Sequence, residues 1–300
     1  MGEMICCAAT YPWHGQGHDR NVASHAPSAP AAPLMPDILP PSSPPGAPLR
    51  FAAGAAIPGN PTLMFLHGAG CGAWVWDEGF AARCAVAGLA SLAPDFTRRR
   101  RGSEAGLADY LAEARALLRG IEGPVVLVGH SLGALVAQHL LLEPNIRGAA
   151  LLTPVPPEGL WLSSAQLALA DPSLWAEAAR MDAPVGSAPL ELATSLFGAG
   201  MPGAEARRFL ARMGGESRAA LLEAQWPQPV PMGWLHGRPM LVLGAAEDRL
   251  ITQDAVHRCA LWHGVAAEIL PGHGHLLMLE PGWEKVADRI AAWAAALPAR

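Results

Sequence analysis

The segment that decides the fold reads Pro124-Val-Val-Leu-Val128-Gly129-His130-Ser131-Leu132-Gly133. Its first five residues form a short apolar run that is typical of a buried strand, and residues 132–142 continue in a helical pattern. A G-x-S-x-G sequence between a strand and a helix is typical of a sharp, strained turn that lifts the serine hydroxyl clear of the sheet. Free amides at the start of the helix would favour negative charge on a tetrahedral intermediate. The segment therefore predicts that Ser131 is a nucleophile, with an inert serine in a tight β–α turn as the alternative.

Strands and helices alternate on both sides of this turn. Continuously apolar strands that alternate with helices predict an α/β fold with a mostly parallel sheet covered on both faces. The predicted strands cover residues 61–66, 89–93, 124–128, 147–152, 239–243 and 265–270. The predicted helices cover residues 76–88, 106–119, 132–142 and 283–297.

Two parts of the chain depart from this alternation. Residues 1–48 are rich in proline, which removes backbone donors, so we expect an extended leader there. The strand signal also stops over residues 154–231, where helical patterns cover 163–170, 172–181, 188–197, 203–213 and 216–225. We therefore predict a helical cap at 154–231, inserted into an α/β core made of residues 49–153 and 232–300.

Composition excludes several classes of protein. The formal charge of −5 argues against a nucleic-acid partner, and the sequence lacks the run of ~18 apolar residues that a membrane span needs. The five cysteines form no CxxC pair, and the N-terminus lacks the basic start and apolar core of a secretory signal, which favours the cytoplasm. The single lysine, Lys285, makes Schiff-base chemistry improbable, and no histidine or cysteine spacing matches a metal motif. We expect no cofactor, no metal and a small-molecule substrate.

A nucleophilic serine needs a base, and the base needs an acid that orients it. In this kind of sheet the acid and then the histidine follow the nucleophile along the chain, each beyond a strand end. Glu247 and Asp248 follow the predicted strand 239–243, and His273 and His275 follow 265–270.

Four motifs in this order resemble the α/β-hydrolase superfamily from about residue 61 to 297. They are His67-Gly68-Ala69-Gly70, Gly129-His-Ser-Leu-Gly133, Gly244-Ala-Ala-Glu-Asp248 and Gly274-His275-Leu-Leu-Met-Leu-Glu280-Pro281.

The resemblance implies a role for particular residues in these motifs. It favours His275, five residues before Glu280, over His273, and the Gly-x-x-x-Asp spacing favours Asp248 over Glu247. It implies that the amides of Leu132 and Ala69 form an oxyanion hole. His67 and His130 are expected to brace their loops rather than react.

The predicted function is that of a serine esterase for small to medium hydrophobic acids. The alternatives are a hydrolase that cleaves carbon–carbon bonds or lactones with the same triad, and a non-catalytic binding protein of this fold. A few apolar residues of the insertion should line the acyl pocket, from the set Trp161, Trp175, Met181, Leu192, Leu196, Phe197, Phe209, Met213 and Trp226. The arginines at 98–101 are read as a solvated loop, with attraction of acidic substrates as the alternative.

Overall fold

The computed structural model describes residues 49–51, 59–96, 105–178 and 195–298, all within one unit, Ser42–Arg300. The leader predicted for residues 1–48 and the arginines at 98–101 lie outside the described residues. Within the described part of the chain, no helix is both long and apolar enough to cross a membrane.

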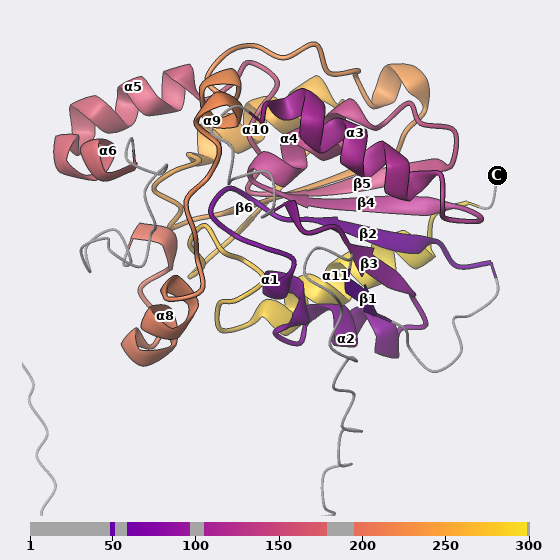
Figure 1. Ribbon diagram of the computed structural model, residues 1–300. Coiled ribbons are helices and arrows are strands. Elements are labelled where there is room, and N and C mark those ends of the chain that lie inside the picture. Colours follow the sequence, from indigo (N-terminus) through magenta and orange to yellow (C-terminus); the bar gives the residue numbers. More distant parts are fainter. Residues whose placement is uncertain (1–48, 52–58, 97–104, 179–194, 299–300) are drawn as a thin grey trace, which may run out of the picture. The chain divides into compact units, whose positions relative to one another are not determined.

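One twisted sheet organises the described residues (Figure 1). Its order is β1-β3-β2-β4-β5-β6-β7, and every neighbouring pair is parallel except β1 and β3, which run antiparallel. The strands are β1 (Leu49–Phe51), β2 (Thr62–Leu66), β3 (Ser91–Ala93), β4 (Val125–His130), β5 (Ile146–Leu152), β6 (Met240–Ala245) and β7 (Ala267–Leu270). The predicted α/β fold with a mostly parallel sheet is confirmed.

Both faces of the sheet are buried, because successive side chains of a strand point to opposite faces. In β2, Leu63 and Phe65 join one core cluster and Met64 and Leu66 join the other. The helices α2 (Phe80–Val86) and α11 (Trp283–Ala295) cover the first face. The helices α3 (Leu107–Leu118), α4 (Leu132–His139) and α10 (Gln253–Trp262) cover the second (Figure 1).

The helix predicted over 76–88 is wrong, because the structure divides it into α1 (Trp74–Asp77) and α2. Gly79 between them has a φ of 109°, in the left-handed region that favours glycine. A Cβ on Gly79 would also lie 2.8 Å from the ring of Trp283. The absence of a Cβ at Gly79 therefore leaves room for the indole of Trp283, on α11, to pack against the backbone between α1 and α2.

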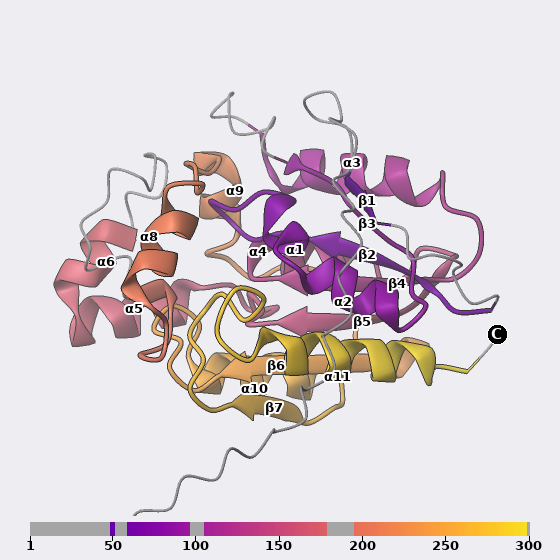
Figure 2. The same cartoon turned by 90° about the horizontal axis from the view of Figure 1, so that it is seen from below.

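The regular structure in the described residues between β5 and β6 is helical. Its elements are α5 (Trp161–Ala170), α6 (Pro172–Ala178), α8 (Gly203–Leu210), α9 (Arg218–Glu223) and the 3-10 turn η3 (Trp234–His236), and the described residues of this stretch form no strand. Figures 1 and 2 place α5, α6, α8 and α9 together beyond one end of the sheet. The prediction for 188–197 falls mostly outside the described residues. The division into a core and a cap at 154–231 stays our proposal.

Candidate active site

Ser131 occupies the turn between β4 and α4 in a strained backbone conformation. Its φ is 52° and its ψ is −116°, values that cost of order 1–3 kcal/mol for a non-glycine residue. The two flanking glycines make the turn possible, since a Cβ on Gly129 would lie 2.6 Å from the Cα of Ala134. A Cβ on Gly133 would collide with the carbonyl oxygens of Leu66 and His67. The sharp turn expected from the sequence is therefore present, with Ser131 at its apex.

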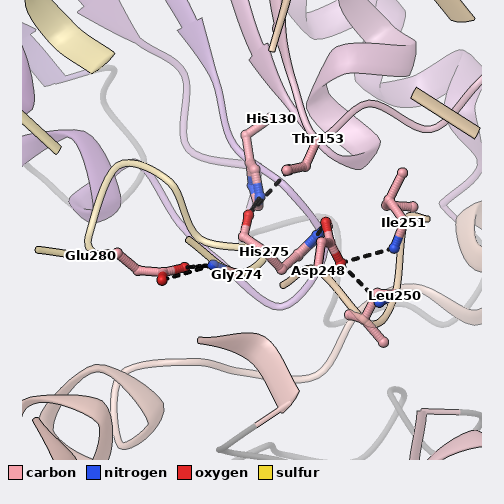
Figure 3. Close-up of polar contacts among 8 residues, drawn as sticks. All are labelled: His130, Thr153, Asp248, Leu250, Ile251, Gly274, His275 and Glu280. Atoms are coloured by element: carbon pink, nitrogen blue, oxygen red, sulfur yellow. Dashed lines mark hydrogen bonds and ion pairs between the residues drawn. The ribbon is translucent and has the colours of Figure 1, made fainter. Parts of the chain in front are cut away.

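His275 and Asp248 form a buried pair beyond the ends of β7 and β6 (Figure 3). The Nδ1 atom of His275 lies 2.8 Å from Oδ2 of Asp248. The other carboxylate oxygen, Oδ1, accepts the N–H groups of Leu250 at 2.8 Å and Ile251 at 2.9 Å. Because Oδ2 is an acceptor, Nδ1 carries the proton in the neutral ring, which leaves Nε2 free to accept one.

The two competing residues face other partners. Glu247 accepts the N–H of Ala199 at 2.6 Å, and Nδ1 of His273 donates to the carbonyl oxygen of Pro271 at 2.9 Å. Neither residue lines the cavity that contains Ser131 and His275. The structure therefore pairs His275 with Asp248, the histidine and the acid that the family resemblance favoured, and not His273 or Glu247.

Two side chains hold the backbone of His275. His130 Nε2 donates to the carbonyl oxygen of His275 at 2.9 Å, and the Thr153 hydroxyl donates to the same oxygen at 3.1 Å (Figure 3). Burial, and then the neighbouring His275, hold the pKa of His130 well below its usual range. A neutral His130 fits the expected bracing role. The sequence analysis did not identify Thr153 as a site residue. Its φ of 39° is unusual for a β-branched residue.

Ala69 and Leu132, the two residues expected to form the oxyanion hole, lie at the cavity that contains Ser131. The hydrogen bonds of the described residues include none donated by their amides. His67 braces the loop that carries Ala69: its Nδ1 donates to the carbonyl oxygen of Gly68 at 2.9 Å, and its Nε2 accepts the N–H of Phe96 at 3.0 Å. This arrangement can present two donors to an oxyanion.

Glu216 is a second residue that sequence reasoning missed. Its buried carboxylate accepts the N–H of Gly70 at 3.2 Å, the hydroxyl of Tyr110 at 2.5 Å and the N–H of Ser217 at 2.8 Å. The N–H of Gly214 also donates to the carbonyl oxygen of Gly70 at 2.9 Å. The segment 214–217 therefore ties down the loop that presents the Ala69 amide.

Ser131, His275, Ala69 and Leu132 line one cavity of about 450 Å³, whose wall is mostly apolar. From the predicted apolar set, Trp175, Leu196 and Met213 line it, whereas Trp161, Phe197, Phe209 and Trp226 do not, and Met181 and Leu192 lie outside the described residues. The helices α5 and α9 add Leu167, Leu221 and Leu222 to the wall. A cavity of this volume and lining suits a small apolar ligand.

Comparisons with known proteins identify the family of the chain. A model of the alpha/beta hydrolase family matches residues 63–289. Among curated protein sequences, none matches the chain.

Solved structures with a similar fold include three from different organisms. A Mycobacterium tuberculosis protein assigned as a non-heme bromoperoxidase has a TM-score of 0.64 at 18% identity, over 85% of this chain and 97% of its own. A carboxylesterase of Nitrososphaera gargenis has a TM-score of 0.61 at 17% identity, over 85% and 97%. An esterase of a Rhodococcus species has a TM-score of 0.56 at 19% identity, over 84% and 95%. At these identities the likeness shows the fold alone.

Proposed function

Because the chain belongs to the alpha/beta hydrolase family, we propose that it is a serine hydrolase that cleaves carboxylic esters of small to medium hydrophobic acids. The observation that carries this proposal is that His275, joined to Asp248 at 2.8 Å, lines the same cavity as the strained Ser131. The fold alone would not support it, since this fold serves many chemistries.

In the proposed mechanism, the Ser131 hydroxyl attacks the ester carbonyl while Nε2 of His275 takes its proton. Asp248 keeps the proton on Nδ1 and stabilises the imidazolium that forms. The amides of Ala69 and Leu132 donate to the oxyanion of the tetrahedral intermediate. His275 then protonates the departing alcohol.

The second half of the reaction uses the same groups. Water, activated by His275, attacks the acyl-enzyme and releases the acid together with the regenerated Ser131 hydroxyl. The apolar cavity wall would hold the acyl chain, which is why we propose hydrophobic acids as substrates.

A panel of p-nitrophenyl esters of increasing chain length tests this function. We expect hydrolysis that rises with chain length until the 450 Å³ cavity is filled and then falls, and we expect it to disappear in Ser131→Ala. Absence of hydrolysis across the panel by folded protein would refute the esterase proposal and favour a carbon–carbon or lactone substrate, or a binding protein.

A further inference from the structure

Arg218 brings a permanent positive charge to the candidate active-site cavity. It is the first residue of α9, its side chain is exposed, and it lines the same cavity as Ser131 and His275. Among the described residues that line the cavity, all except Arg218, His130 and His275 have uncharged side chains. Because the side chain is exposed, water solvates the guanidinium, and an anion that enters the cavity can replace that water with a charge-assisted hydrogen bond.

No carboxylate among the described residues pairs with Arg218. Elsewhere in the described chain, Arg208 and Arg212 pair with Glu78, Arg249 pairs with Asp171 and Arg258 pairs with Glu158. The acid nearest to Arg218 in sequence, Glu216, instead accepts hydrogen bonds from Gly70, Tyr110 and Ser217. The guanidinium therefore remains available to an anion that enters the cavity.

A second polar group on the cavity wall also points to a ligand with polar atoms. Ser163, on α5, is 3% exposed, and its hydroxyl finds no partner among the described residues. Its neighbour Ser164 donates to Gln225 at 2.7 Å, and all three residues line the cavity. A buried hydroxyl without a partner requires an explanation, and a ligand that bonds to it supplies one.

We propose that the substrate carries a carboxylate in addition to its ester group, as a half-ester of an aliphatic dicarboxylic acid does, and that Arg218 binds this carboxylate. The apolar wall accommodates the hydrocarbon segment between the two groups. Hydrolysis consumes one water and yields the dicarboxylate and the alcohol. This inference rests on the proposed esterase function for its chemistry, but the binding of the anion can be measured separately.

The kinetic test compares a half-ester with a neutral ester of similar chain length, monoethyl adipate with ethyl hexanoate, in a pH-stat. We expect the ratio of kcat/KM values, half-ester over neutral ester, to fall up to about fivefold in Arg218→Ala, because an Arg–carboxylate pair at an exposed site contributes on that order. Arg218→Lys should restore part of the ratio, since it keeps the charge but loses the planar fork. Arg207→Ala is the matched control: Arg207 is an exposed arginine on α8 outside the cavity wall, and its loss should leave the ratio unchanged.

The binding test uses calorimetric titration of monoethyl adipate into Ser131→Ala and into the Ser131→Ala/Arg218→Ala double variant. We expect the affinity to fall up to about fivefold in the double variant and the affinity of Ser131→Ala to weaken with added salt. If neither ester is hydrolysed but binding depends on Arg218, the esterase function fails and the anion site stands. Equal kcat/KM ratios and equal affinities with and without Arg218 would overturn the inference while leaving an active esterase intact.

Discussion

Replacing Asp248 by asparagine tests how the acid controls the protonation of His275. In the structure, Oδ1 of Asp248 accepts two backbone N–H groups, at 2.8 and 2.9 Å, and Oδ2 accepts Nδ1–H of His275 at 2.8 Å. An asparagine must turn its carbonyl oxygen toward the two N–H donors, because its NH₂ group would face them unfavourably. The NH₂ group then faces His275 and selects the tautomer with the proton on Nε2.

That tautomer cannot accept the proton of Ser131. The loss expected for a triad with the wrong tautomer is about 10⁴ in kcat, or about 5.5 kcal/mol of activation free energy. KM should change little, because Asp248 is not among the residues that line the cavity. The assay is steady-state hydrolysis of the best p-nitrophenyl ester, with circular dichroism to show that the variant is folded.

Glu247→Gln is the matched control for Asp248→Asn. It makes the same acid-to-amide change one residue away, where the carboxylate accepts the N–H of Ala199 and does not line the cavity. We expect less than a twofold change in kcat. The reasoning is refuted if folded Asp248→Asn keeps more than about a tenth of the activity, or if Glu247→Gln loses as much as Asp248→Asn.

Three further predictions concern stability and the loop beside Ser131. Glu216→Ala should lower the free energy of unfolding by about 3 kcal/mol in urea titrations, because it leaves the donors of Gly70, Tyr110 and Ser217 without their acceptor. A loss below about 0.5 kcal/mol would contradict this. Ser163→Ala should be neutral or stabilising by up to about 1 kcal/mol in the same titration, since it removes a buried hydroxyl without a partner among the described residues, and clear destabilisation would be evidence against that. Burial lowers the pKa of His263 from 6.5 to about 4, so protonation of this histidine favours the unfolded state between these pH values. The free energy of unfolding should therefore be unaffected by His263 above pH 6.5 and should fall by about 1.4 kcal/mol per pH unit as the pH drops from 6.5 toward 4. His263→Gln should remove that pH dependence in urea titrations, and an unchanged slope would exclude His263 as its origin.

The strands β2 to β7 and the turn at Ser131 could be predicted from the sequence because their signals are local, whereas β1, only three residues long, was not predicted. The apolar run before Gly129 marks a strand buried on both faces, and the two glycines mark a turn that only residues without a Cβ permit at these positions. The choice between neighbouring residues, such as Asp248 and Glu247, needed the family resemblance. The cytoplasmic location stays a prediction.

Other features could not be predicted because they depend on distant contacts. Glu216 lies 146 residues from Gly70 and 106 from Tyr110 along the chain, and no local periodicity marks a polar residue buried by such partners. Thr153 is likewise defined by its bond to His275, 122 residues away. The break at Gly79 reflects the approach of Trp283 from the far end of the chain.

The most direct test of the central claim is covalent labelling with a fluorophosphonate, followed by mass spectrometry of the modified peptide. The account predicts one adduct, on Ser131, that forms in the folded protein and is absent from folded Ser131→Ala. Labelling should slow strongly in His275→Ala, because the hydroxyl then has no base. An adduct on a different residue, an adduct that persists in Ser131→Ala, or no adduct on the folded wild-type protein would contradict the assignment of Ser131 as the nucleophile.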